Sequence, residues 1–284
     1  MSGKLYVVST PIGNLGDMTP RALETLRSVD FIAAEDTRVG AKLLNRFGIK
    51  KPQVSYFEHN RRQKGEMLAE RMENGESCAL ITDAGTPAIS DPGTDLVALC
   101  AQRGIEVVSV PGCCAVAAAL SVAGMECGRF TFEGFLSTNK KNRSEHLAQL
   151  RTETRTMVFY EAPHKLVRTL EDMLQALGDR PVALCRELTK LHEQVFRTTL
   201  SGALEHYRQT PPRGEFVLVV GALPAAEQGE GVPDEQSLME EIGGILLAEH
   251  CGLMAAVRQV SARYGLSKNA LYQKALRVYG RPED

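Results

Sequence analysis

Short apolar segments alternate with segments of helical periodicity along the first 120 residues of the chain. Thr19 is suited to cap a helix that starts at Pro20, and glycines such as Gly48 stand where later helices should end. Alternation of this kind predicts a largely parallel sheet covered by helices. The strands are expected at 4–9, 31–35, 54–57, 78–82 and 105–110, and the helices at 20–29, 40–47, 65–74, 95–103 and 115–123.

The pattern changes after Gly124, where segments typical of strands follow one another with fewer long crossovers. These segments are 130–135, 156–160, 182–187, 193–199 and 215–220. Such spacing predicts a mixed α+β domain with antiparallel pairs. We therefore expect an N-terminal parallel α/β domain over residues 1–119 and a second, mixed domain over residues 120–223.

Residues 224–237 are acidic and rich in Pro and Gly, which is typical of a linker, and residues 238–284 show only helical patterns. The segment 264–276 is similar to the second half of a helix-turn-helix, with Ser267 as a cap and an apolar face at Leu271 and Leu276. Two interpretations stay open for this region, an RNA-contacting surface and a helical cap with solvated charges. Between residues 251 and 281 there are six basic residues and no acidic one: Arg258, Arg263, Lys268, Lys274, Arg277 and Arg281.

Composition excludes several classes of protein. With 43% hydrophobic and 24% charged residues the chain is in the ordinary globular range, and its net charge of −2 means that a nucleic acid must be bound by local patches. Seven cysteines without a C-x-x-C pair predict free thiols in a reducing compartment. We find neither a signal peptide nor a span of about 20 apolar residues, and we expect a soluble, cytoplasmic protein without membrane contact.

Three loops rich in Gly and Pro each follow a predicted strand, at 10–14, 83–87 and 111–115. Ligands of open α/β sheets bind beyond the carboxyl ends of the strands, so three such loops predict a ligand crevice, although a single loop could be only a tight turn. The chain has no dinucleotide-binding or P-loop glycine motif, no zinc-type Cys/His spacing and no G-x-S-x-G. The three loops, in a chain without these motifs, indicate a small, cofactor-like ligand.

The segments VVSTPIGNLGDMTPRAL, AAEDTR, ALITDAGTPAISDPG, VPGCCAVAAALSVAG, FEGFL and FYEAPHK resemble the tetrapyrrole-methylase-like S-adenosylmethionine-dependent methyltransferases. Within them, the chain is most similar over residues 4–280 to the branch that methylates the ribose 2′-hydroxyl of a cytidine in 16S ribosomal RNA of the small subunit. The resemblance implies an α/β fold of two domains with the cofactor cleft between them, plus a small C-terminal helical domain. It also implies S-adenosyl-L-methionine as cofactor, a homodimer and no metal.

The cofactor contacts of this family can be carried over to positions in the three loops and in the FYEAPHK segment. Backbone groups exposed by Gly and Pro turns can hydrogen-bond a ligand, while apolar side chains hold its adenosine. The residues that the resemblance implies are Pro11, Asp83, Gly85, Thr86, Ala88, Ile89, Ala115, Phe159, Tyr160 and Ala162.

Methyl transfer to a hydroxyl requires in-line placement of the reacting atoms and a group that accepts a proton from a very weak acid. The sequence alone does not determine which side chain accepts the proton. An acid at a strand end is more often a loop organiser than a base, which applies to each candidate. Among them we place Asp36 first and Glu133 second. The full set of candidates is Glu35, Asp36, His59, Glu133, Glu161 and Glu187.

An RNA substrate needs phosphate contacts, and two basic stretches are expected in loops near the cleft. The stronger is 139–144, NKKNRS, which could form a mobile loop that clamps RNA, or be only a solvated surface loop. Aromatic residues are only 6% of the chain, which favours recognition of shape and phosphates over base stacking. The candidate RNA-binding residues are Arg61, Arg62, Lys140, Lys141, Arg143 and, in the C-terminal region, Lys268.

Two other functions compete with an RNA methyltransferase. A small-molecule methylase of the tetrapyrrole type would share the fold, but the added basic helical region argues against it. A non-catalytic RNA-binding assembly factor would have lost the cofactor, and the intact segment 83–87 argues against that loss.

Overall fold

The computed structural model describes residues 2–223, 234–264 and 266–279. The chain divides into two compact units, Met1–Ala222 and Leu223–Asp284, and each is considered by itself. Within the described ranges, no helix combines the length and apolar character needed to cross a membrane.

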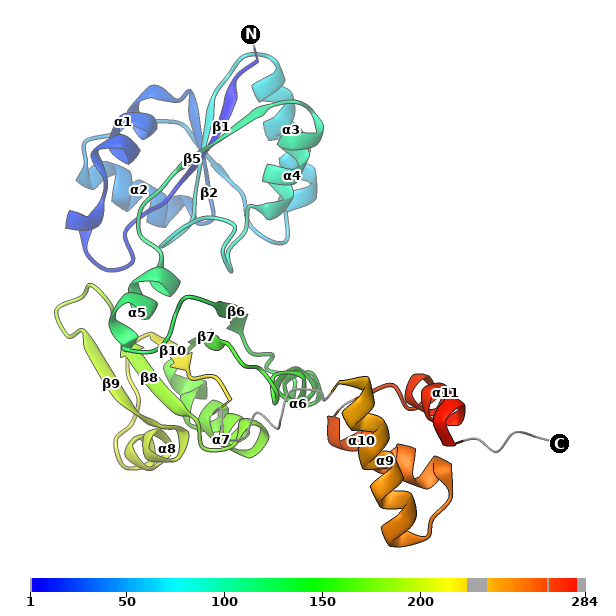
Figure 1. Cartoon of the computed structure of the whole chain (residues 1–284). Coiled ribbons are helices and arrows are strands. Elements are labelled where there is room, and N and C mark those ends of the chain that lie inside the picture. The colour runs from blue at the N-terminus through cyan, green and yellow to red at the C-terminus, as the bar shows by residue number, and fades with distance from the viewer. Residues whose placement is uncertain (1, 224–233, 265, 280–284) are drawn as a thin grey trace. The chain divides into compact units, whose positions relative to one another are not determined.

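The first half of unit 1 is built on an entirely parallel five-stranded sheet with the order β3-β2-β4-β1-β5 (Figure 1). The prediction of a parallel sheet is therefore confirmed, and each strand lies within two residues of its expected bounds. The strands are β1 (Lys4–Val8), β2 (Phe31–Ala34), β3 (Gln53–Ser55), β4 (Cys78–Ile81) and β5 (Glu106–Val110).

Helices cover both faces of this sheet: α1 (Pro20–Ser28) and α2 (Thr37–Arg46) on one, α3 (Arg61–Glu73) and α4 (Thr94–Gln102) on the other (Figure 1). A short 3-10 helix, η1 (Leu15–Asp17), precedes α1. Thr19 caps α1 as expected, because its hydroxyl accepts a hydrogen bond from the N–H of Ala22 at 3.1 Å. Helix α3 begins four residues before its expected start, so Arg61 and Arg62 lie on a helix and not in a loop.

The second half of unit 1 contains a mixed sheet with the order β6-β7-β10-β8-β9. β6 and β7 are parallel, and all other neighbours are antiparallel, which confirms the prediction of antiparallel pairs in this part of the chain. The strands are β6 (Phe130–Phe135), β7 (Thr156–Glu161), β8 (Pro181–Arg186), β9 (Gln194–Thr199) and β10 (Phe216–Val220).

Helix α5 (Ala115–Ala123) packs on one face of the second sheet, against Val158, Ala183 and Val217. The other face is covered by α6 (Lys140–Gln149), α7 (Leu166–Leu177) and α8 (Leu200–Gln209), with the 3-10 helix η2 (Pro163–Lys165) leading into α7. Because the small apolar side chains of α5 are buried on the second sheet, the boundary between the halves precedes Ala115. The expected boundary after residue 119 falls inside this helix and is wrong.

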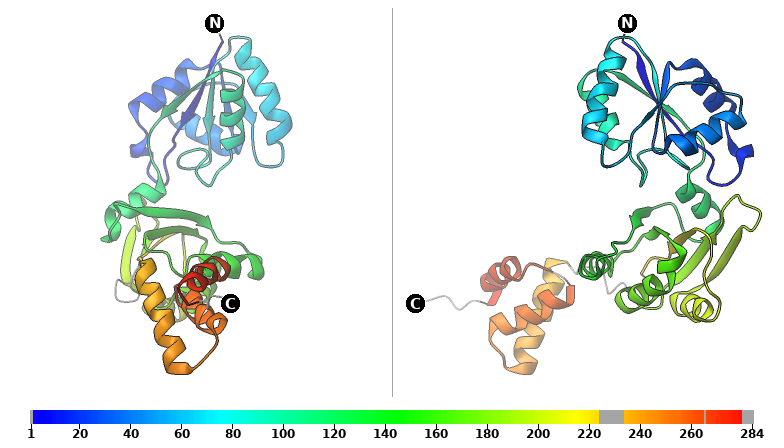
Figure 2. Two further views of the ribbon diagram at one scale, coloured as in Figure 1. Left: turned by 45° about the vertical axis from the view of Figure 1, so that its right-hand side comes forward. Right: turned by 180° about the vertical axis from the view of Figure 1, so that it is seen from behind.

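Unit 2 consists, in its described residues, of α9 (Glu235–Glu249), α10 (Leu253–Tyr264) and α11 (Lys268–Tyr279), which pack around Ile242 and Val257 (Figure 2). Asp234 caps α9, because its carboxylate accepts a hydrogen bond from the N–H of Ser237 at 2.8 Å. The last residues of the expected linker, 235–237, are therefore helical. Residues 224–233 lie outside the described residues.

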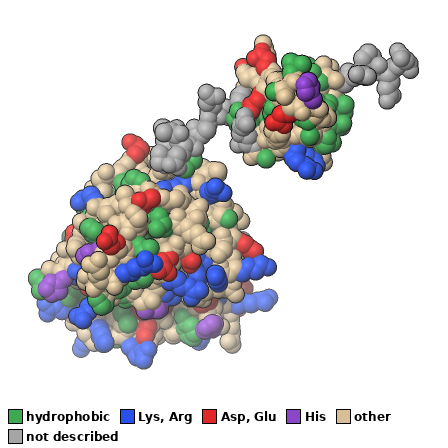
Figure 3. Space-filling model, turned by 90° about the horizontal axis from the view of Figure 1, so that it is seen from below, with side chains coloured by type: hydrophobic (Ala, Val, Ile, Leu, Met, Phe, Trp, Pro, Cys, Tyr) green, Lys and Arg blue, Asp and Glu red, His purple; other side chains and the backbone are tan. Residues whose placement is uncertain are grey.

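The fold places acidic side chains beside the basic residues of the C-terminal region. Helix α9 brings carboxylates to it, and Lys274 forms an ion pair with Glu235 at 2.6 Å. Acidic and basic side chains both occur on the visible face of unit 2 (Figure 3). Leu271 is buried as expected, but Leu276 is 36% exposed, since the residue one helical turn from Leu271 is Ala275.

Replacing Phe159 by Ala should lower the free energy of unfolding of unit 1 by about 3–5 kcal/mol, because its fully buried ring would leave a cavity in the core. Urea denaturation followed by circular dichroism would measure the change. As a control, Leu191→Ala removes a side chain that is 93% exposed and should change stability by no more than about 0.5 kcal/mol. Equal losses in both variants would contradict the burial of Phe159.

Candidate functional site

A cavity of about 410 Å³ lies in unit 1, at the carboxyl ends of first-sheet strands and against the second sheet. This volume is within the range of roughly 300–1,000 Å³ typical of ligand pockets, and the lining is mostly apolar. The first half and the start of α5 contribute Ile12, Ala84, Gly85, Thr86, Ile89, Asp91, Cys114 and Ala115. The second half contributes Phe135, Tyr160, Glu161, Ala162, Pro163, Cys185, Leu188, Glu215, Phe216 and Val217.

The three Gly- and Pro-rich loops are joined to one another beside this cavity. Thr10 and Gly85 exchange two backbone hydrogen bonds, at 2.8 and 3.0 Å. The hydroxyl of Thr86 donates to the carbonyl of Cys113 at 2.9 Å and accepts from the hydroxyl of Ser9 at 2.9 Å. One threonine thus connects all three loops, and the prediction that they gather at one edge of the sheet is confirmed.

In the structure the second loop continues to Gly93, the residue before α4, and its backbone is unusual where it lines the cavity. Ala88 and Ser90 have φ angles of 68° and 62°, a region that residues other than glycine rarely adopt. Gly93 has a φ of 141°, and a Cβ atom there would lie 2.8 Å from Leu80. Packing around the loop must hold this conformation, which is a common property of ligand-binding segments.

Apart from Phe159, the residues expected to contact a cofactor fall into two groups in the structure. Those that line the cavity are Gly85, Thr86, Ile89, Ala115, Tyr160 and Ala162. Pro11, Asp83 and Ala88 are not among the lining residues, and each immediately precedes one that is. Contact with a cofactor stays a prediction for both groups.

The expectation for the side chain of Phe159 is wrong. Successive residues of a strand point to opposite faces of the sheet. Tyr160 faces the cavity, whereas Phe159 is fully buried in the core formed with α6, α7 and α8. Tyr160 and Ala162 therefore form this part of the wall without it.

Asp36 is the N-cap of α2, and its carboxylate is fully engaged by Arg38. It accepts hydrogen bonds from the backbone N–H of Arg38 at 2.8 Å and from the guanidinium at 2.6–3.2 Å. The hydrogen bonds from Arg38 hold the pKa of Asp36 down at about 2. Asp36 is also not among the cavity-lining residues, so the geometry does not favour it as a proton acceptor.

The other candidate acids also have structural partners. Glu133 lies 2.9 Å from Nε2 of His146 on α6 and is not among the cavity-lining residues. Glu161 lines the cavity, but its oxygens accept hydrogen bonds from the N–H of Ala162 at 2.8 Å and the hydroxyl of Thr169 at 2.5 Å. A hydrogen bond from Lys190, at 2.9 Å, lowers the pKa of Glu187.

Two acids line the cavity that the sequence reasoning did not single out, Glu215 and Asp91. Glu215 forms an ion pair with Lys190 at 2.8 Å. Asp91 lies between Ser90 and Pro92 in the second loop and is half-buried. Burial, together with the nearby carboxylate of Glu35, raises the pKa of Asp91 to about 6. A carboxylate with a pKa near neutrality is suited to accept a proton. The signal that could have found it is its place in the segment DAGTPAISDPG, directly after a buried strand.

Residues 139–144 do not form the expected loop. Helix α6 begins at Lys140, and the side chain of Asn139 caps it by accepting from the N–H groups of Lys141 and Asn142. Lys140 and Lys141 are exposed, but Arg143 is only 4% exposed.

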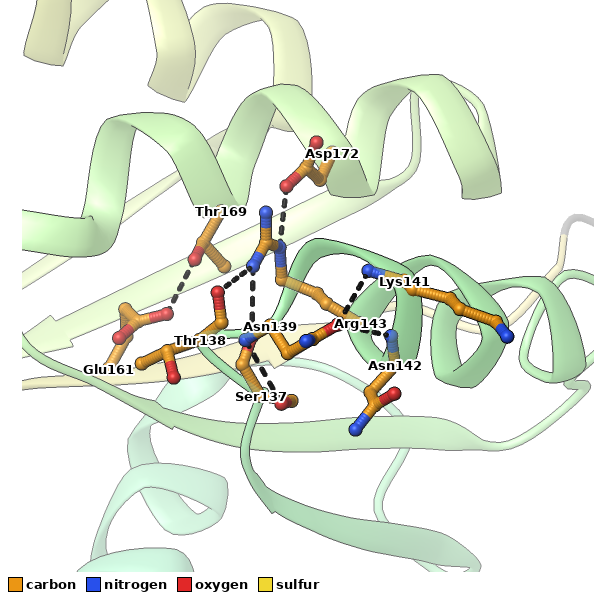
Figure 4. A network of polar contacts seen from close by, with 9 residues as sticks. All are labelled: Ser137, Thr138, Asn139, Lys141, Asn142, Arg143, Glu161, Thr169 and Asp172. Atoms are coloured by element: carbon orange, nitrogen blue, oxygen red, sulfur yellow. Dashed lines mark hydrogen bonds and ion pairs between the residues drawn. The ribbon is translucent and has the colours of Figure 1, made fainter.

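The guanidinium of Arg143 is bound inside the protein (Figure 4). It donates to the carboxylate of Asp172 on α7 at 2.6 Å and to the carbonyls of Ser137 and Thr138 at 2.9 and 3.2 Å. The expectation that Arg143 contacts RNA is therefore wrong, because its charge fixes the segment after β6 to α7.

The remaining basic candidates are exposed on helices. Arg61 and Arg62 lie in the first turn of α3, where Arg61 forms an ion pair with Asp95 at 3.0 Å. Lys268 is the first residue of α11. Contact of these residues with RNA stays a prediction.

Comparison with known proteins identifies the family. Residues 4–203 match the family described as Tetrapyrrole (Corrin/Porphyrin) Methylases. A relative from Synechocystis sp. named ribosomal RNA small subunit methyltransferase I is 47% identical over 278 residues, which are 97% of this chain and 98% of the relative. The chain belongs to the ribosomal RNA small subunit methyltransferase I family of tetrapyrrole methylases.

Two further similarities concern the extent of this family's fold. A Thermotoga maritima relative of the same name is 47% identical over 218 residues, which are 77% of this chain and 98% of the relative. The crystal structure of cobalt precorrin-4 methyltransferase aligns with a TM-score of 0.58 at 19% identity, covering 77% of this chain and 94% of that one. The 77% of the chain that each of these proteins covers is about the length of unit 1, Met1–Ala222.

Replacing Arg143 by Ala should lower the free energy of unfolding by about 3–5 kcal/mol, because it leaves the carboxylate of Asp172 without its charge partner. Denaturation curves would measure the loss. The matched control is Lys141→Ala, which removes an exposed cation from the same helical turn and should change stability by no more than about 0.5 kcal/mol. An Arg143→Ala variant of unchanged stability with weakened RNA binding would restore the original expectation.

Proposed function

We propose that this chain is an S-adenosyl-L-methionine-dependent methyltransferase that methylates the ribose 2′-hydroxyl of a cytidine in 16S ribosomal RNA. The observation that carries the proposal is the similarity to small-subunit RNA methyltransferases over nearly the whole chain. The cavity in unit 1 supports it, since it lies among the loops that carry the family resemblance.

The residues of the cavity suit this cofactor. Ile12, Ile89 and Leu188 offer an apolar surface for an adenosine, in a cavity large enough for a ligand of this size. Helix α5 begins at the cavity, and its N-cap Cys114 makes no side-chain capping hydrogen bond. Its first N–H groups are therefore suited to bind a carboxylate. S-adenosylmethionine supplies an electrophilic methyl group on a sulfonium.

Asp91 replaces Asp36 and Glu133 as the proposed proton acceptor. A ribose hydroxyl is a very weak acid, so the carboxylate of Asp91 would assist the reaction by accepting its proton. The enclosing walls of the cavity would hold the hydroxyl in one orientation beside the methyl group of the cofactor, and this positioning would supply most of the acceleration. Tyr160 also lines the cavity, and burial raises the pKa of its hydroxyl, which stays a hydrogen-bond donor at neutral pH.

The exposed cations are proposed to bind RNA phosphates around the cavity. They are Arg61, Arg62, Lys140, Lys141 and Lys268. The homodimer implied by the family resemblance and the cytoplasmic location stay proposals as well.

Incubation with methyl-labelled S-adenosylmethionine and small ribosomal subunits that lack the modification should yield labelled 2′-O-methylcytidine. Mass spectrometry of nucleosides released by nuclease would identify the product. Label on a base would keep the methyltransferase but refute the ribose acceptor. Cofactor binding by calorimetry without transfer to RNA would favour a small-molecule methylase, and absence of cofactor binding would favour an assembly factor.

Asp91→Asn should lower kcat by at least about 100-fold without weakening cofactor affinity, because the amide cannot accept the proton. In the wild type, kcat/KM should rise with pH with a midpoint near pH 6, the pKa of Asp91, and level off once Asp91 is fully ionised. In Asp91→Asn, this decrease of kcat/KM at low pH should be absent.

Asp36→Asn is the matched control, because Asn also caps helices and Asp36 does not line the cavity. It should keep near wild-type activity. If the control loses activity while Asp91→Asn retains it, the assignment of the acceptor reverts to Asp36.

A further inference from the structure

A large aromatic side chain stands at the mouth of the cavity. Phe135, the last residue of β6, lines the cavity and yet is 56% exposed. Its ring contacts the ring of Tyr160 edge to face, with centroids 5.4 Å apart, and Tyr160 in turn contacts Phe132 at 5.0 Å. The ring of Phe135 therefore packs on Tyr160 while more than half of its surface remains accessible.

The backbone before Phe135 is irregular in a way that determines where this ring lies. The pairing of β6 with β7 shifts register between Phe132 and Gly134, and such a bulge re-aims the side chains that follow. Gly134 has a φ of 62°, and a Cβ atom there would lie 3.0 Å from the hydroxyl of Ser90. Glycine at this position therefore allows the second loop to approach β6 closely, and this approach brings the loop beside Phe135.

The second loop adds another accessible apolar side chain to the same rim. Ile89 lines the cavity and is 41% exposed. The rim of the cavity thus presents an aromatic ring and an aliphatic side chain. Such a surface is suited to contact the flat, apolar face of a ligand that extends beyond its reacting group.

A nucleotide whose ribose enters the cavity must place its base somewhere near the mouth. Every base has a flat face, and stacking on an aromatic side chain contributes about 1–3 kcal/mol per base. We propose that Phe135 is the stacking platform for the base of the acceptor nucleotide. This inference rests on the proposed function and names a substrate contact at the same site. It also modifies the expectation that recognition of shape and phosphates is favoured over base stacking.

The kinetic test compares substitutions of Phe135 on subunits that the wild type methylates. Phe135→Ala and Phe135→Leu should both lower kcat/KM for the subunits by roughly 5- to 150-fold, which corresponds to the energy of one stack. Phe135→Tyr should retain most of it, because the aromatic face remains. Cofactor affinity, measured by calorimetry, should be the same in all variants.

The matched control is Phe130→Ala, which changes the same residue type at the other end of β6. Phe130 is 43% exposed and is not among the cavity-lining residues. It should keep the kcat/KM of the wild type. The proposal is overturned if this control is equally impaired, if Phe135→Leu is as active as the wild type, or if Phe135→Ala weakens cofactor binding by the same factor as kcat/KM.

A binding test distinguishes failure of this inference from failure of the proposed reaction. The chain contains no tryptophan, so Phe135→Trp introduces a single fluorescent indole. A protein-free 16S RNA transcript should quench its emission at saturation, and should not quench that of Phe130→Trp. Quenching without methyl transfer would support the platform while refuting the reaction. Equal quenching in both variants, or none in either, would refute the platform.

Discussion

The hydroxyl of Thr86 is the contact on which the rest of the candidate site depends. It accepts from Ser9 after β1 and donates to the carbonyl of Cys113 after β5, while Thr86 itself follows β4. A hydroxyl group can donate one hydrogen bond and also accept hydrogen bonds. The side chain of Thr86 does both, and it thereby connects three segments that are distant in sequence. The loops that line the cavity are therefore positioned as a set, by the parallel sheet that ends beneath them.

Helix α5 connects this set of loops to the second half of unit 1. Its first residue lines the cavity, whereas Val116, Ala119 and Leu120 are buried against the second sheet. The wall opposite is built by alternate residues of the second sheet, with Tyr160 facing the cavity and Phe159 in the core behind it. The same side-chain packing that stabilises the second half thus determines the shape of the site.

Alternation of apolar segments and glycines was sufficient to predict both sheets, because that signal is local. Three site residues depend on information that is not local. Both faces of β7 are buried, so the run that contains Phe159 gives no sign of which residue faces the cavity. In the sequence Arg143 is one more cation of a basic stretch, and only the fold brings Asp172, 29 positions away, against it. The pKa of Asp91 depends on burial and on Glu35, which only the folded chain provides.

Every residue that lines the cavity belongs to unit 1, and none comes from the described helices α9, α10 and α11. Unit 2 packs around a hydrophobic core of its own. Evolution can therefore alter the core of these helices without repacking the side chains of unit 1 that shape the cavity.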